Sequence, residues 1–508
     1  MNIRICTIGA LAIGAILIIV GILSLTVVPL TVSKEVSKNG HLGFDENDTY
    51  NVMTQRWIEQ KYSMKLEVWT VSVTNPDDVI RRGHYPTLVE KGPYVYREYR
   101  KRVKVNFMQN NTRVLFRNRR YYIYDKNESC AECSLSDSVT IPNVMFQNII
   151  NIAAKSSPVV QKLIKFALTY FKRETPFINV TVNQMLFDGY DDPLIDWICK
   201  RSLTRPLCIL SGISSPIKFL ENNTDSGEYL IDSGLEDTSR IGRVYAWNGR
   251  NETPWWSTAQ ARKINGTDGE LFSPQLSSSN DLPIFLGELG RSLYLHYDKS
   301  VTHGQIPSYR YVIPRRVYDP FLPENKGFCR PETPRYFDSD IQPQGCLPTG
   351  IFDIGHTKLG SPLVYLSGAH FYQSSPQVYQ NFTGFRHPDS SDATYIDIEP
   401  YTGVVVGAHA AVQINVGMIG SNLYVFDKIP SAIVPVLWTK ELVDVDEDTK
   451  RDLEKILFIP RGARILGILL VGVGLILWTA FLVISLGKMC LKRNADDETQ
   501  LIEDNAES

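Results

Sequence analysis

Two long apolar segments, one near each end of the chain, dominate the pattern of hydrophobic and polar positions. The first runs from Ile5 to Leu30 and is closed by Pro29, and the second runs from Ile465 to Leu486 without a charged residue. A helix rises about 1.5 Å per residue, so roughly 20 apolar residues cross a ~30 Å hydrocarbon core. Both segments are therefore predicted to span a membrane. Both chain ends would then lie on one side and the large middle region on the other.

The first apolar segment is expected to be a retained anchor and not a cleaved signal peptide. A signal peptide has an apolar part of about 7–15 residues followed by a small-residue cleavage site. This segment is longer, and Val27–Leu30 at its end offers no such site.

Positive charge beside the spans predicts which side of the membrane is cytosolic. Arg4 precedes the first span, and Lys488 and Lys492 follow the second; Arg461 and Arg464 on the other flank oppose this assignment. Cytosolic flanks carry an excess of Lys and Arg, so both termini are expected in the cytosol. The expected order is a cytosolic N-terminus (1–4), a span (5–30), a lumenal or extracellular domain (31–461), a span (465–486) and a cytosolic tail (487–508).

Glycosylation signals agree with a middle region outside the cytosol. The N-x-[ST] signal requires an exposed asparagine in a secretory compartment. It occurs between the two spans, at Asn47, Asn110, Asn127, Asn179, Asn222, Asn251, Asn265 and Asn381. Pro254 directly after Thr253 makes Asn251 the poorest acceptor among them.

Cysteine usage points to the same compartment. Six cysteines lie between the spans, and an even number there indicates disulfides, most simply between nearest neighbours: Cys130, Cys133, Cys199, Cys208, Cys329 and Cys346. The Cys130-x-x-Cys133 motif is expected to be a tight local disulfide, because no second pair stands nearby at zinc-ligand spacing. Cys6 and Cys490 at the membrane edges are candidates for palmitoylation, although a lone juxtamembrane cysteine is often unmodified.

Short segments rich in aromatic and β-branched residues predict strands in the middle region. They are Tyr94–Tyr99, Arg113–Tyr124, Tyr309–Val312, Thr394–Ile398 and Leu423–Phe426. Clusters of Pro, Gly, Asn and Asp separate them at short intervals. The composition, with 43% hydrophobic and 21% charged residues, is that of an ordinary globular domain. We therefore expect one large, mainly antiparallel β domain of the α+β class.

The stretch from Asn143 to Arg173 breaks this pattern and predicts helices. One helical segment is expected near Val144–Ala154, and Pro158 suits the first turn of another. In the second, apolar residues recur at helical spacing, at Val159, Val160, Leu163, Ile164, Ala167, Leu168 and Phe171. This region is basic through Lys155, Lys162, Lys165, Lys172 and Arg173. It is either a solvated helix face over a small core or a surface that attracts anionic ligands or a protein partner.

Catalytic and nucleotide-binding motifs are absent from the sequence, which holds no G-x-S-x-G, H-E-x-x-H or P-loop pattern. Its eight histidines stand singly, without metal-ligand spacing. Gly472 and Gly474 lie inside the second span, where glycine aids helix packing. A net charge of −2 gives no general attraction to nucleic acid. We expect no enzyme, no cofactor and no nucleic-acid partner.

Several motifs resemble one known family, the class B scavenger receptors, nearly end to end. The similar blocks are Asn75–Tyr96 (ending G-P-Y-V-Y), Thr181–Leu194, Trp247–Gly249, Trp255–Trp256, Ile264–Gly269 (I-N-G-T-D-G), Gly327–Cys329, His370–Tyr372 and Asp397–Gly403. The resemblance implies a barrel-like ectodomain with an apolar tunnel, capped by an apical helical bundle. It also implies that the basic helix falls in that bundle, where its lysines would attract lipoproteins, fatty-acid carboxylates or other anionic ligands.

The chain departs from the family pattern in its cysteines. Cys329 and Cys346 match the family's loop disulfide, in a longer loop. A second family bridge is missing on both sides, where Gly290 and Asp353–Gly355 stand. Cys130, Cys133, Cys199 and Cys208 would form this chain's own bridges, in pairs that the resemblance leaves open.

The tail contains Asp497-Glu498-Thr499-Gln500-Leu501-Ile502, which resembles an acidic dileucine sorting signal. Asp497, Leu501 and Ile502 would bind the clathrin-adaptor machinery; the alternative is an unstructured, solvated tail. We expect a receptor of the endolysosomal or plasma membrane that binds lipids or lipoproteins and transfers lipid through its tunnel to the membrane. The alternative is a sorting receptor whose apical helices bind a lumenal protein.

Overall fold

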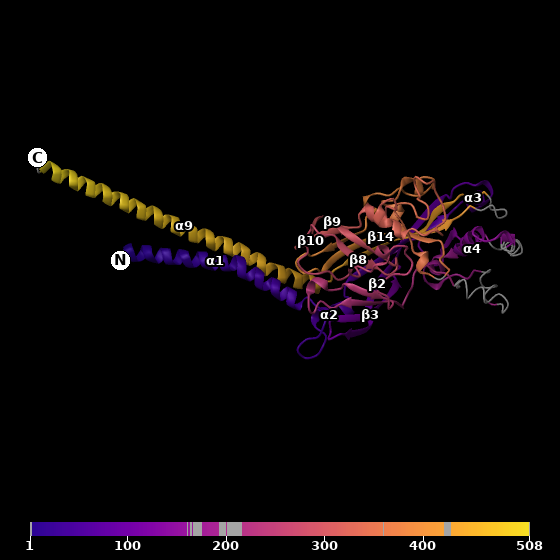
Figure 1. Cartoon of the computed structure of the whole chain (residues 1–508), viewed down its shortest axis with the longest axis horizontal. Helices are drawn as coiled ribbons and strands as arrows, with labels where there is room; N and C mark the ends of the chain where they lie inside the picture. The colour runs from indigo at the N-terminus through magenta and orange to yellow at the C-terminus, as the bar shows by residue number, and fades with distance from the viewer. Residues whose placement is uncertain are drawn as a thin grey trace. The chain divides into compact units, whose positions relative to one another are not determined.

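The computed structural model describes residues 3–159, 161–162, 165, 175–192, 200, 216–358, 360–420 and 428–506 (Figure 1). The chain divides into two compact units. Met1–Asn39 and Glu447–Ser508 form the first, and Gly40–Asp446 forms the second.

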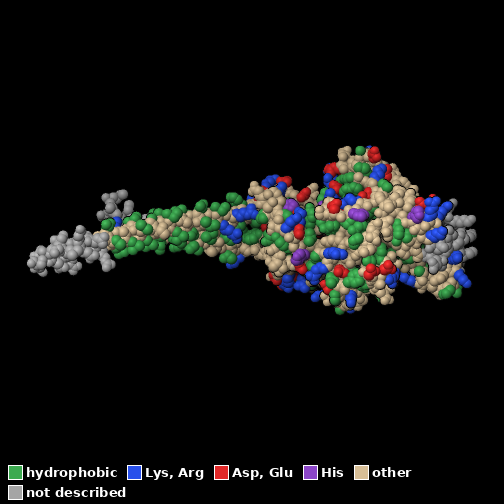
Figure 2. Space-filling model, turned by 90° about the horizontal axis from the view of Figure 1, so that it is seen from above, with side chains coloured by type: hydrophobic (Ala, Val, Ile, Leu, Met, Phe, Trp, Pro, Cys, Tyr) green, Lys and Arg blue, Asp and Glu red, His purple; other side chains and the backbone are tan. Residues whose placement is uncertain are grey.

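The first unit consists of two long helices, α1 (Ile3–Asn39) and α9 (Glu447–Ala506). Leu11–Asn39 and Glu447–Leu491 are long and apolar enough to cross a membrane, and Figure 2 shows mainly hydrophobic side chains on the visible face of this helical unit. The helices extend beyond the predicted apolar segments, because a helix outside the bilayer needs no apolar side chains. The tail, for which an unstructured form was the alternative, is helical as far as Ala506.

Glycines allow α1 and α9 to pack closely. A Cβ added to Gly474 would lie 2.7 Å from the carbonyl oxygen of Gly14, and one added to Gly467 would lie 2.8 Å from that of Gly21. Small residues at such crossings let two backbones approach each other in a membrane. The expectation for Gly474 is therefore confirmed. That for Gly472 is wrong, because nothing lies within 4 Å of its Cβ position.

The second unit is built around one antiparallel sheet, whose described strands number 13. Neighbouring strands follow in the order β7 (Val244–Trp247), β6 (Thr224–Asp232), β3 (Arg113–Tyr124), β2 (Leu88–Met108), β1 (Ser63–Val73), β15 (Ala432–Asp444), β14 (Val405–Met418), β13 (Tyr395–Ile398), β10 (Ile306–Val312), β9 (Arg291–His303) and β8 (Leu282–Leu286). β12 (Val364–Gly368) also pairs with β14, and β11 (Ile351–Asp353) pairs with β12.

The predicted strands and the first predicted helix are confirmed where the structure describes them. The four strand segments before residue 400 lie in β2, β3, β10 and β13. Leu423–Phe426 lies outside the described residues. Helix α4 (Val144–Ala154) has the expected bounds, and the side chain of Asn143 caps it by accepting from the amides of Met145 and Phe146. Beside it, β4 (Ser138–Pro142) pairs with β5 (Phe177–Thr181) in a separate small sheet.

Three further short α-helices lie in the described part of this unit, which also contains short 3-10 and π-helical segments. The three α-helices are α2 (Val52–Ile58), α3 (Pro76–Arg82) and α8 (Ala259–Arg262). Of the apolar positions predicted for the second helix, Val159 is described and is exposed. The others, from Val160 to Phe171, lie outside the described residues.

The ends of the large sheet, β7 and β8, are joined through the segment Gly266–Thr267. The amide of Val244 on β7 donates to the carbonyl of Gly266 at 2.8 Å, and the amide of Phe285 on β8 donates to the carbonyl of Thr267 at 2.7 Å. The sheet therefore closes almost completely into a barrel. Closure requires glycine at position 266, where φ is +95° and an added Cβ would lie 2.1 Å from the carbonyl oxygen of Pro283.

Replacement of Gly266 should open this closure. We predict that Gly266→Ala lowers the free energy of unfolding by roughly 2–6 kcal/mol, the sum of backbone strain and overpacking. Gly269→Ala is the matched control, since Gly269 has a φ of +86° but no atom within 4 Å of its Cβ position. It should cost only the strain, about 1–3 kcal/mol. Denaturant unfolding of the detergent-solubilised chain measures both, and equal losses would contradict the role given to Gly266.

Candidate functional site

A cavity of about 290 Å³ lies inside the barrel. This volume is near the lower end of the roughly 300–1,000 Å³ that ligand pockets occupy. Most of its wall is apolar, and its lining includes Met64, Ile284, Leu286, Leu289, Leu293, Leu295, Ile313, Tyr318, Phe352, Leu366, Ile396, Val405, Ala408, Ala410, Val412 and Val443.

The cavity exists because small side chains face it from β14. Side chains alternate between the two faces of a strand, so Ala408, Ala410 and Val412 share one face. All three line the cavity and are only half-buried. On β9, Leu293 and Leu295 share a face in the same way and line it too. An alanine face opposite larger aliphatic residues leaves an apolar space that the protein does not fill itself.

One part of the cavity wall is a largely buried ion-pair cluster centred on Arg100 of β2. The guanidinium of Arg100 donates to Glu98 Oε1 at 2.6 Å, to Glu270 Oε1 at 3.0 Å and to Glu441 on β15. Burial raises the pKa of Glu98. Burial also acts to raise the pKa of Glu441, but Arg100 and Arg120 outweigh it and hold that pKa below its usual value.

A second buried arginine connects this cluster to the closing segment. Arg102 donates to Glu270, and its Nη2 lies 3.9 Å from Asp268 Oδ2. Burial lowers the pKa of Arg102 to about 10 and raises the pKa of Asp268. The cavity therefore has a largely self-neutralised polar part and a larger apolar part, which suits a ligand with a long apolar portion.

The sequence did not reveal this cluster. Its members come from β3, β2 and β15, which lie close together in the sheet, and from the 268–270 segment, which closure of the barrel adds to them. The one available signal was the pair of arginines at alternate positions, Arg100 and Arg102, within an otherwise aromatic and β-branched strand. Such a pair is more often found on the solvent face of a strand.

The basic residues predicted for ligand binding lie elsewhere. The ammonium group of Lys155 donates to the backbone carbonyl of Glu332, and burial lowers its pKa. Lys162 and Lys165 are exposed, and none of these three lysines lines the cavity. Lys172 and Arg173 lie outside the described residues, so ligand binding by this set stays a prediction.

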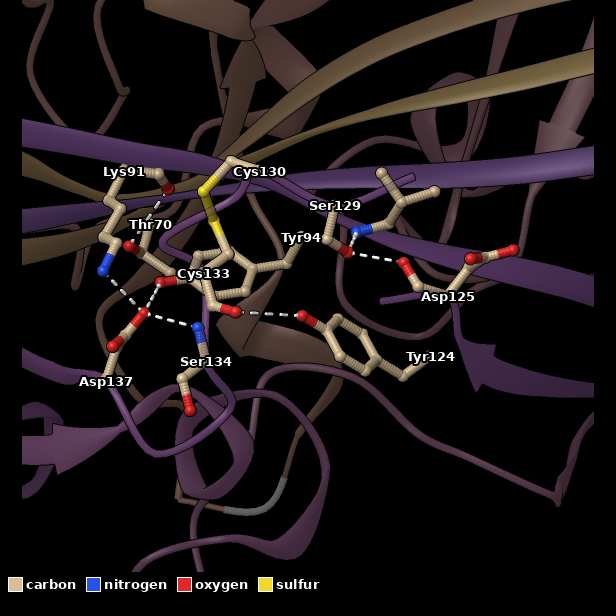
Figure 3. Close-up of a disulfide and its surroundings, with 11 residues drawn as sticks. Thr70, Lys91, Tyr94, Tyr124, Asp125, Ser129, Cys130, Cys133, Ser134 and Asp137 are labelled. Carbon is tan, nitrogen blue, oxygen red and sulfur yellow. Dashed lines mark hydrogen bonds and ion pairs between the residues drawn. A yellow bond between two sulfur atoms is a disulfide. The ribbon is translucent and has the colours of Figure 1, made fainter. Parts of the chain in front are cut away.

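Cys130 and Cys133 are joined by a disulfide in the loop after β3 (Figure 3). Asp137 ties this loop to β2, because its Oδ2 accepts from the hydroxyl of Tyr94 at 2.7 Å and pairs with Lys91 Nζ at 2.8 Å. Burial acts to raise the pKa of Asp137, but these partners outweigh it and keep the pKa low. The motif therefore fixes a loop to the barrel.

A second disulfide joins Cys329 to Cys346. Cys199 and Cys208 lie outside the described residues, and so does the side chain of Cys6. Cys490 is free and exposed, as palmitoylation requires. In the described part of the chain, no three His, Cys, Asp or Glu side chains are grouped as a metal ion would need.

The glycosylation signals all lie in the second unit, with exposed asparagines. These are Asn47, Asn110, Asn127, Asn179, Asn222, Asn251, Asn265 and Asn381. Exposure is what the modification needs, while the modification itself stays a prediction. The backbone at Asp497, Leu501 and Ile502 is helical, and their side chains lie outside the described set.

A buried histidine forms a cluster that its isolated position in the sequence did not suggest. His370 Nε2 lies 2.9 Å from Glu90 Oε1 on β2, and its Nδ1 lies 2.9 Å from Asp392 Oδ1. Arg386 pairs with the same Asp392 and approaches Nδ1 of the ring to 2.8 Å. Trp438 Nε1 donates to Glu90 Oε1 at 2.9 Å. Burial lowers the pKa of His370, but the two carboxylates outweigh it and the pKa is raised above its usual value.

The fold thus defines a β-barrel domain in a chain with two terminal helices able to cross a membrane. A model of the CD36 family matches residues 12–485. Scavenger receptor class B member 1 from Mus musculus is 28% identical over 440 residues, 85% of this chain and 80% of the relative. Lysosome membrane protein 2 from Rattus norvegicus is 27% identical over 445 residues, 86% of this chain and 88% of the relative. The chain belongs to the CD36 family.

The raised pKa of His370 predicts a pH dependence of stability. Its protonated form stabilises the fold fully below the unfolded pKa of about 6.5, and this contribution is lost as the pH rises through the folded pKa. We predict that His370→Gln lowers the melting temperature more at pH 5.5 than at pH 8. His84→Gln is the control, because His84 is exposed. An equal loss at both pH values would contradict the prediction.

Proposed function

We propose that this chain is a scavenger-type receptor of the plasma or lysosomal membrane, which binds a lipid or lipid-like ligand in the barrel cavity and transfers it to the membrane. The observation that carries this proposal is the cavity of about 290 Å³ with its face of small residues on β14. Each methylene group moved from water into such a space contributes about 0.8 kcal/mol. An acyl chain or sterol is therefore the ligand that this wall binds best.

We further propose that residues 31–461 are lumenal or extracellular and that both termini are cytosolic. The exposed glycosylation signals and the two disulfides among the described residues of the second unit support this arrangement. Two anchors would keep a lipid-binding domain at a membrane that receives its cargo.

Filling the cavity tests the proposal. Ala410→Phe places a ring in the space beside β14 and should reduce saturable binding of labelled stearic acid and stearyl alcohol at least tenfold, measured on the full chain in a neutral detergent. Ala259→Phe is the matched control, because Ala259 is exposed on α8 and does not line the cavity. Its binding should equal that of the unmodified chain. Undiminished binding by Ala410→Phe would place the ligand outside the cavity.

The second candidate is a sorting receptor for a lumenal protein. Lys162 and Lys165 favour it, since both are exposed on a helical segment and would attract an acidic partner. The proposed tail signal, Asp497 with Leu501 and Ile502, would direct receptor and partner to the lysosome.

Separate mutations test the two parts of this candidate function, the sorting signal in the tail and the binding of a partner by the lysines. Leu501→Ala with Ile502→Ala should move the receptor and its co-purifying partner from lysosomes to the cell surface. Surface labelling measures the location of the receptor, and pull-down measures the partner that it retains. Lys162→Glu with Lys165→Glu should leave the receptor in lysosomes and release the partner. Continued lysosomal delivery of the tail variant would show that these residues are not the sorting signal. If the lysine variant recovers the same amount of partner, Lys162 and Lys165 do not bind it.

A further inference from the structure

Arg291 begins strand β9 on the same face as Leu293 and Leu295, which line the barrel cavity. Its side chain is buried, with 7% of the residue exposed. It lines a second, smaller pocket of about 40 Å³. Tyr318 and Phe352 line both the cavity and this pocket, so the two spaces adjoin.

The guanidinium of Arg291 has no acidic partner in the described part of the chain. Its central carbon lies 3.5 Å from the ring centroid of Phe328 and 4.7 Å from that of Phe352. Its Nη2 donates to the carbonyl of Val317 at 3.4 Å, and its buried Nε has no hydrogen-bond partner. Burial lowers the pKa of Arg291 to about 9.

A buried charge without a counterion is costly, and buried charges in proteins are almost always paired. Among the described residues that line the same pocket, Asp353 is the one carboxylate, and it is already engaged. Its Oδ2 pairs with Arg330 at 3.3 Å, and its Oδ1 accepts from the amide of His356 at 3.2 Å. The pocket thus presents unused N–H donors and an uncompensated positive charge beside an apolar cavity.

We propose that Arg291 binds the carboxylate head group of an acyl ligand whose chain occupies the barrel cavity. The inference rests on the proposed function and adds the position and chemistry of the head group. The planar guanidinium matches a carboxylate in shape and donor geometry. Leu293 and Leu295 continue the same strand face into the cavity, so a chain attached to that carboxylate would lie against them.

The ion-pair cluster at the cavity wall is the less suitable position for an anion. Glu98, Glu270, Glu441 and Asp268 already surround Arg100 and Arg102 there, and four acids face three arginines when Arg120 is included. A ligand carboxylate would meet these acids at close range, whereas among the described residues no carboxylate pairs with Arg291, and Asp353 in the same pocket is engaged by Arg330.

The test compares labelled stearic acid with stearyl alcohol, which share a chain and differ in the head group, on the full chain in neutral detergent at pH 7.4. The unmodified chain should bind the acid at least tenfold more tightly than the alcohol, because a hydrogen-bonded charge pair is worth more than a neutral contact. Arg291→Met should abolish this preference and retain binding of the alcohol. Arg316→Met is the control, since Arg316 is an exposed arginine near the ring of Tyr294, and it should keep the preference.

Four outcomes would overturn the inference. If the unmodified chain binds acid and alcohol equally, the proposed head-group site is wrong, but the proposal of a ligand in the cavity is not affected. If it binds neither, both the head-group site and the cavity proposal are wrong. If Arg291→Met still prefers stearic acid to stearyl alcohol, the carboxylate binds elsewhere. The same follows if the single variant Arg120→Gln loses this preference. If Arg291→Met does not fold, Arg291→Gln, which keeps an N–H donor for the Val317 carbonyl, provides the same comparison.

Discussion

Closure of the barrel depends on the close approach of the backbone at Gly266 to the backbone at Pro283. The approach leaves no space for a Cβ, and it supplies the hydrogen bonds that join β7 to β8 through Thr267. A sheet without this connection would have two open edges, and its inner apolar face would be exposed to water. A protected interior cavity therefore requires this contact.

The same segment also builds the polar part of the cavity. Directly after Thr267 the chain reaches Asp268 and Glu270, which lie against Arg100 and Arg102. Removing one partner of a buried ion pair typically costs about 3–5 kcal/mol, because it leaves an uncompensated charge. Closure and charge neutralisation are thus coupled: a change that displaces Gly266 also withdraws the acids that the buried arginines need.

The sequence predicted features that depend on local pattern. The apolar length of the two terminal segments, the aromatic and β-branched residues of Arg113–Tyr124 and the expected helical segment near Val144–Ala154 each correspond to an element of the structure. Features that depend on distant strands were missed. The sequence gives no sign that Arg291 is buried without an acidic partner among the described residues. That environment comes from Phe328 and Phe352, whose rings the fold places against its guanidinium. His370 gives no local sign of Glu90, 280 positions away.

The second disulfide that the family resemblance implies would lie in this same region. Gly290 stands where one of its cysteines is expected, and an added Cβ there would lie 2.8 Å from the ring of Trp255 and 3.3 Å from the side chain of Thr357. Aromatic packing therefore occupies space beside Gly290 that a bridge would need. The carbonyl of Gly290 accepts from Trp256 Nε1 at 2.6 Å, and the ring of His356 lies 4.3 Å from that of Trp256. These contacts connect the start of β9 to the segment after β11 without a covalent bond, and they hold the strand end from which Arg291 projects.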